Sequence, residues 1–84
     1  MQDKKKELLE ILAKVIKELR GNNSISRLSM EVDISKSIWS NIECAKRDAQ
    51  LSTLWKISEA LNIKPSELLK IIETKLGENF SFIE

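Results

Sequence analysis

The stretch DISKSIWSNIECAKRD, residues 33–48, gathers short polar and cationic side chains around one tryptophan. These side chains can all donate hydrogen bonds: Lys36, Ser37, Ser40 and Asn41, followed by Lys46 and Arg47. Serine and asparagine compete with the backbone for hydrogen bonds, so a helix that served only the fold would be more stable with Ala, Glu or Gln. The side chains are therefore candidates for hydrogen bonds to a partner outside the chain. The alternative is a polar face that contacts only water.

Composition argues against catalysis and against metal binding. The 84-residue chain contains no His and no Tyr, and its one cysteine is Cys44. Histidine is the commonest general base and metal ligand, and a single thiolate does not make a zinc site. We therefore predict that the chain is not an enzyme and that it uses neither a metal nor another cofactor.

The sequence also predicts a cytoplasmic chain without membrane contact. No apolar run is long enough to span a bilayer, and the Lys-rich N-terminus leads into a charged helical pattern rather than a signal peptide. Cys44 has no second cysteine with which to form an internal disulfide, which is typical of a reducing compartment. Cys44 is either a redox switch or a spectator thiol. We favour the spectator, because only Lys46 and Arg47 are nearby activating charges.

Charge is nearly balanced over the chain, with 14 Lys and Arg against 13 Asp and Glu and a net charge of +1. A strong nucleic-acid binder usually shows a basic face. Two local clusters can supply one here: Lys4, Lys5 and Lys6 near the start, and Lys46 with Arg47. The N-terminal lysines can form an arm on DNA phosphates or a solvated, frayed end, and we favour the frayed end.

Hydrophobic periodicity predicts five helices and no strand before the last seven residues, ENFSFIE. Ser24 and Ser35 are candidate N-caps, Pro65 suits a first helical position, and Gly77 suits a helix end. Asp33 is a candidate turn residue, since aspartate tolerates left-handed backbone. The predicted helices cover residues 8–19, 24–31, 35–43, 51–61 and 65–76. We therefore predict one all-α domain over residues 1–84, with a short tail at 78–84.

The second and third predicted helices have the spacing of a helix-turn-helix over about residues 24–43. In this motif the first helix braces the second, whose outer face can enter the major groove of DNA. If Trp39 and Ile42 face the core, the hydrogen-bonding side chains point elsewhere, with Lys36, Ser37 and Ser40 the most outward. Asparagine pairs with adenine, lysine donates to guanine acceptors, and serine can address either base.

An ordered set of short motifs resembles the Cro and phage-repressor helix-turn-helix family, also called Xre-like. The matching pieces are Leu28-Ser29, Asp33, Ile34-Ser35, Trp39-Ser40-Asn41-Ile42-Glu43, Ala45-Lys46-Arg47 and KISEALNIKPSELL. The resemblance implies a lambda-repressor-like fold and a sequence-specific transcriptional regulator that binds double-stranded DNA. A repressor or autoregulator is favoured, and a restriction–modification controller or an antitoxin is also compatible.

The same resemblance assigns roles to individual residues. It implies base contacts from Lys36, Ser37 and Asn41, with Ser40 beside them. It implies phosphate contacts from Ser24, Lys46 and Arg47, and from Cys44 or its backbone amide. Glu43 tends to be structural in the family. Asp33 and Ala45 stand where the family has glycine, and Ile25 stands where many members have a polar residue.

Two further hypotheses arise from apolar residues. Ile25, Met30 and Ile38 would place apolar groups on or near the DNA face, which favours a protein-interaction module that keeps the fold without an operator. Ile38 can instead contact a thymine methyl group, or pack half-buried, which we favour.

The first helix and the tail raise the question of a dimer. We expect Leu9, Leu12, Ile16 and Leu19 to face inward, so that Leu8, Ile11 and Val15 widen the apolar surface. The tail adds Phe80, Phe82 and Ile83. Either the tail folds back over this surface, or both build a homodimer interface. A homodimer would suit a palindromic operator.

Overall fold

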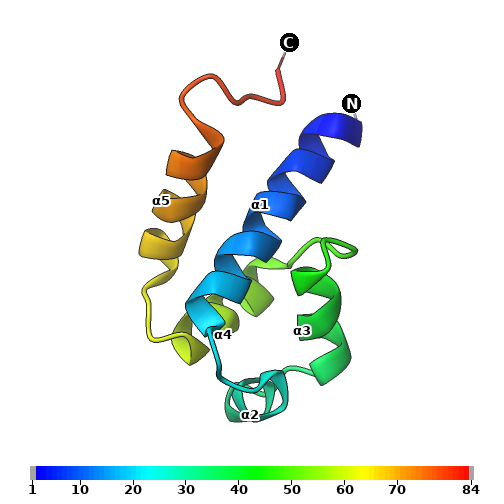
Figure 1. Ribbon diagram of the computed structural model, residues 1–84, viewed down its shortest axis with the longest axis vertical. Helices are drawn as coiled ribbons and strands as arrows, with labels where there is room; N and C mark the ends of the chain where they lie inside the picture. Colours follow the sequence, from blue (N-terminus) through cyan, green and yellow to red (C-terminus); the bar gives the residue numbers. More distant parts are fainter. Residues whose placement is uncertain (1, 84) are drawn as a thin grey trace.

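The computed structural model describes the backbone of residues 2–83 and the side chains of residues 4–83, and this part of the chain contains five helices and no strand (Figure 1). The helices are α1 (Gln2–Arg20), α2 (Ile25–Glu31), α3 (Lys36–Glu43), α4 (Leu51–Ala60) and α5 (Pro65–Leu76). The predicted all-α fold is therefore confirmed.

The longest helix, α1, runs through the middle of the molecule and contacts α3 and α5 (Figure 1). Helix α2 contacts α3 and α4, and α4 contacts α5. The centre of the core consists of side chains from four helices that are at most 1% exposed: Ile16, Trp39, Ile42, Ile57 and Leu68. Short helices such as α2 and α3 are marginal alone, so this shared core holds them in place.

The predicted caps and turns are confirmed. The Ser24 and Ser35 hydroxyl oxygens accept hydrogen bonds from the first turns of α2 and α3, at 3.2 and 3.0 Å. Asp33 and Ala45 adopt φ of 58° and 59°, the left-handed region that favours glycine. Helix α5 begins at Pro65 and ends at Leu76, and Gly77 follows it with a φ of 88°.

Helix α1 begins at Gln2, well before the predicted start at Leu8. The favoured frayed end at Lys4–Lys6 is therefore wrong, because these residues lie within the helix. The tail provides one physical reason: the Lys4 ammonium lies 5.3 Å from the centroid of the Phe80 ring. This cation–π contact links the first turn of α1 to the end of the chain.

The inward face of α1 is rotated from the predicted one. Val15 is fully buried in the core, and Leu8 and Ile11 pack against the core as partly buried residues. Leu19, in contrast, is 37% exposed. The surplus apolar surface expected on α1 is thus covered within the chain. Periodicity predicted an apolar helix face but not its centre, which depends on how α3 and α5 pack against α1.

The tail forms no regular structure over residues 77–83 and lies near the beginning of α1 (Figure 1). Phe80 is half-buried and packs edge-to-face on Phe82, with ring centroids 5.5 Å apart. Phe82 and Ile83 are exposed. The tail therefore lies beside the start of α1, where Phe80 contacts Lys4 rather than the apolar residues Leu8, Ile11 and Val15, and it leaves α3 uncovered (Figure 1).

Candidate nucleic-acid interface

The turn between α2 and α3 is closed by backbone hydrogen bonds. The Ile34 amide donates to the Ser29 carbonyl at 2.9 Å, and the Asp33 amide donates to the Met30 carbonyl at 3.4 Å. The left-handed backbone of Asp33 redirects the chain at this point, and the Lys56 ammonium on α4 donates to the Asp33 carbonyl at 3.4 Å. These contacts fix the position of α2 relative to α3, so that α2 supports α3 as in a helix-turn-helix.

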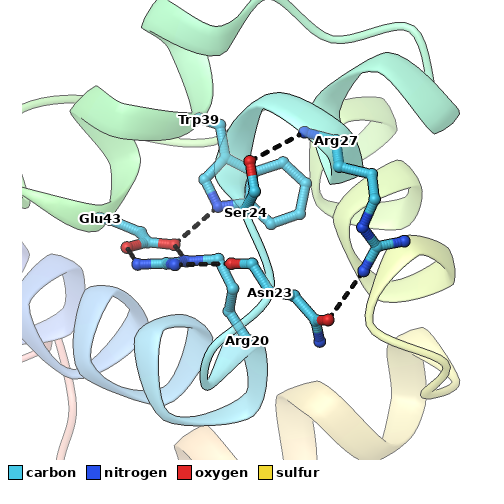
Figure 2. Close-up of polar contacts among 6 residues, drawn as sticks. All are labelled: Arg20, Asn23, Ser24, Arg27, Trp39 and Glu43. Atoms are coloured by element: carbon cyan, nitrogen blue, oxygen red, sulfur yellow. Dashed lines mark hydrogen bonds and ion pairs between the residues drawn. The ribbon is translucent and has the colours of Figure 1, made fainter.

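A buried polar network joins α3 to α1 (Figure 2). The Arg20 guanidinium donates through Nε to Glu43 Oε2 at 2.6 Å and through Nη2 to Oε1 at 2.8 Å. Trp39 Nε1 also donates to Glu43 Oε2, at 2.7 Å, and Arg20 Nη1 donates to the Asn23 carbonyl at 2.8 Å. The network therefore connects the end of α1, the loop before α2 and the end of α3.

The Arg20–Glu43 pair is protected from solvent. The two side chains are 18% and 4% exposed, so their attraction is little screened. The pKa of Arg20 is raised above its ordinary value, chiefly by its hydrogen bonds to Glu43 and secondarily by the charge of that carboxylate, while burial opposes the rise. The network positions α3, and the structural role expected for Glu43 is confirmed.

The predicted base-contacting residues lie on the side of α3 away from its buried residues Trp39 and Ile42. Lys36 and Ser37 are exposed, whereas Ser40 and Asn41 are half-buried. Ser40 is therefore less outward than predicted. Within the part of the chain that the structure describes, these side chains make no internal hydrogen bond: Lys36, Ser37, Ser40 and Asn41.

The predicted phosphate-contacting residues flank α3. Ser24 caps α2, and its hydroxyl accepts the Arg27 amide while its own hydrogen stays available to an anion (Figure 2). Lys46 and Arg47 are exposed in the loop that follows α3. The three residues are therefore exposed at the beginning of α2 and just after the end of α3.

The Cys44 amide is not free for a phosphate contact. The amides of Cys44, Ala45 and Lys46 donate to the carbonyls of Ser40, Ile42 and Asn41, at 3.0, 3.1 and 2.9 Å. The expectation that the Cys44 amide contacts a phosphate is therefore wrong, because the backbone turns back onto the last turn of α3. An anion beside these three amides would depend on side chains.

Two arginines near this face were not predicted as site residues. The one local sequence feature that distinguishes Arg20 is its position at the end of the first predicted helix, which is rich in apolar residues. Arg27 donates to Asn23 Oδ1 at 2.7 Å and to Glu31 Oε2 at 2.9 Å, which orders the exposed surface of α2. Asn23 thus accepts hydrogen bonds from both arginines. Its backbone carbonyl accepts from Arg20, and its side-chain oxygen accepts from Arg27.

The apolar residues near this face differ in exposure. Ile25 and Ile38 are half-buried against the core, as favoured for Ile38, whereas Met30 is 81% exposed. Among the described residues, no three His, Cys, Asp or Glu side chains cluster as metal ligands do. No helix over residues 2–83 is sufficiently long and apolar for a membrane crossing.

Comparison with known proteins gives two matches. Residues 12–74 match the Cro/C1-type HTH DNA-binding domain family. A 50-residue stretch is 36% identical to control protein C.BamHI of Bacillus amyloliquefaciens, and it covers 60% of this chain and 62% of that protein. No solved structure matches the chain. Because the family match covers most of the chain and coincides with the helix-turn-helix, the chain belongs to the Cro/C1-type HTH DNA-binding domain family.

Proposed function

We propose that this chain is a sequence-specific transcriptional regulator, a small repressor or autoregulator, that reads the major groove with α3. The observation that carries the proposal is the outer face of α3. Its four hydrogen-bonding side chains are not used within the described chain, and the helix beneath them is anchored by Arg20, Trp39 and Glu43. Such a face is preorganised for base edges.

Family membership supports binding rather than catalysis as the activity, since the family is one of DNA-binding domains. The relative from Bacillus amyloliquefaciens is named a control protein, which supports a regulatory role here. A cytoplasmic location belongs to the same proposal, because duplex DNA is the partner. In this proposal Lys36, Ser37, Ser40 and Asn41 contact bases. Ser24, Lys46 and Arg47 contact phosphates.

A selection from random duplexes, followed by footprinting on the enriched sequence, tests this function. We expect the selection to enrich one sequence. In the footprint, the bound chain should protect the base pairs at which α3 enters the major groove. Equal affinity for enriched and random duplexes would contradict sequence-specific regulation.

The Lys46→Ala variant tests whether Lys46 contacts a phosphate, which positions the chain on DNA, or a base, which determines sequence preference. We expect it to weaken binding to the enriched and random duplexes alike, because a phosphate contact carries no sequence information. We also expect the slope of log K against log salt to become shallower by about 0.9, the contribution of one phosphate contact. Titrations over a salt series check both. A loss confined to the enriched duplex would make Lys46 a base reader instead.

We further propose that the regulator acts as a homodimer on a palindromic operator, and that α4 and α5 provide the interface. Leu51 and Trp55 are 70% and 52% exposed and line two adjoining shallow grooves. The exposed Leu69 and the ring of Pro65 complete one of these grooves. A protomer about 22 Å wide is compatible with two recognition helices about 34 Å apart.

The double variant Leu51→Lys with Trp55→Lys tests this interface. Both side chains are exposed, so we expect an intact fold but a mass of one chain in sedimentation equilibrium, where the unaltered protein has the mass of two. The matched control is Phe82→Lys, which places the same charge on the exposed tail and should leave the mass unchanged. A single-chain mass for the unaltered protein would refute the dimer. A single-chain mass for Phe82→Lys alone would place the interface on the tail.

A second candidate function is a protein-interaction module, which the exposure of Met30 on α2 favours. In that case the Met30→Lys variant would lose a protein partner and the unaltered chain would show no sequence preference on DNA. The duplex selection separates the two functions.

A further inference from the structure

A shallow groove of about 500 Å³ lies between the middle of α1 and the end of α3, at the edge of the helix-turn-helix. Lys14 and Lys17 of α1 line one side of it, and Cys44 and Ala45, at the beginning of the loop after α3, line the other. Both lysines are exposed. The groove floor includes Ala13, a small buried residue that lets the two walls approach closely.

The charge of this groove is set by the lysines. The Glu43 carboxylate at its edge is already bound by Arg20 and Trp39, so it accepts little further positive charge. Glu10, one turn before Lys14, is the remaining acidic side chain that lines the groove. Among residues 4–83, neither Lys14 nor Lys17 lies within salt-bridge distance of a carboxylate.

The beginning of the loop beside the groove has no backbone amide available to an anion. The three amides that begin it, from Cys44 to Lys46, all donate to carbonyls of α3. Beside these three amides, cationic side chains are the donors that remain for a phosphate contact. The loop offers Lys46 and Arg47, and α1 adds Lys14 and Lys17 across the groove from its start.

We infer that Lys14 and Lys17 of α1 contact phosphates of the DNA backbone at the end of α3, extending the phosphate contacts of Lys46 and Arg47. The inference rests on the proposed function, because it takes duplex DNA as the partner. Ammonium groups on flexible stems suit a phosphate backbone, and each contact releases counterions from the duplex. Helix α1 thus binds DNA directly, in addition to positioning α3 through Arg20.

The test compares the full chain with the double variant Lys14→Ala and Lys17→Ala on the enriched duplex and on a random duplex, over a salt series. We expect affinity to fall about tenfold on both duplexes near physiological salt, and the slope of log K against log salt to become shallower by about 1.8 for two lost contacts. Ethylation interference should reveal phosphates whose modification weakens binding of the unaltered chain but not of the variant.

Two further variants sharpen the test. Lys70→Ala removes an exposed charge from α5, which does not contact α3, and should leave the slope unchanged. Glu10→Gln removes the opposing charge from the groove and should strengthen binding about twofold. Circular dichroism should show the same helicity for all variants, since the replaced side chains are exposed.

Each outcome decides the inference. An unchanged slope in the Lys14 and Lys17 variant, or an equal change in the α5 control, would overturn the α1 contact while an enriched duplex kept the proposed function. A reduced slope without any sequence preference would support the α1 contact and refute sequence-specific regulation. Failure of the unaltered chain to bind either duplex would refute both.

Discussion

Replacement of Glu43 by alanine is expected to destabilise the fold by about 3–5 kcal/mol, the usual cost of removing one partner from a buried ion pair. Arg20 would keep its charge at a site where its side chain is only 18% exposed, and Trp39 Nε1 would lose its acceptor. The total stability of an 84-residue domain is about 4–13 kcal/mol. The loss is therefore a large part of the total, and urea unfolding followed by circular dichroism measures it.

The matched control for Glu43→Ala is Glu31→Ala. Glu31 also pairs with an arginine, Arg27, at 2.9 Å, but both side chains are more than half exposed. An exposed pair of this kind contributes less than about 1 kcal/mol. Equal destabilisation by the two variants would show that the buried network does not anchor α3. Glu43→Gln keeps an acceptor for Trp39 and should fall between them.

Combined replacement of Lys36 and Asn41 by alanine is expected to remove most of the preference for the enriched duplex over random DNA. Each base contact contributes about 1–3 kcal/mol of discrimination, so the pair contributes about 2–6 kcal/mol. Affinity for the random duplex should fall only slightly, through the lost lysine charge. Competition titrations with the two duplexes measure this ratio.

The controls for the α3 variant address folding and charge. Lys36 is exposed and Asn41 half-buried, so thermal unfolding should show a folded protein. Lys70→Ala removes one exposed lysine from α5 and should preserve the preference for the enriched duplex. If the Lys36 and Asn41 variant binds the enriched duplex with unchanged affinity, then α3 does not read the bases through these residues.

The helices and their ends were largely predictable from the sequence, because local interactions decide them. Ser24 and Ser35 cap their helices through hydrogen bonds within three residues, and Pro65 fixes a backbone angle that suits a first turn. Asp33 takes the left-handed conformation that its short polar side chain tolerates. The exposed polar side of α3, which is the candidate reading face, was also predictable in outline, because Trp39 and Ile42 fix which side is buried.

The tertiary structure alone decided which helix covers which surface. Val15 rather than Leu19 faces the core of a molecule in which α1 packs against both α3 and α5, and Ser40 is half-buried, and periodicity along one helix predicts neither result. Arg20 meets Glu43 across 23 positions of sequence, and Lys14 and Lys17 meet the loop after α3, only once these helices are packed. A local pattern specifies the polar and apolar sides of a helix. The neighbour that each side contacts depends on the free energy of the assembled core.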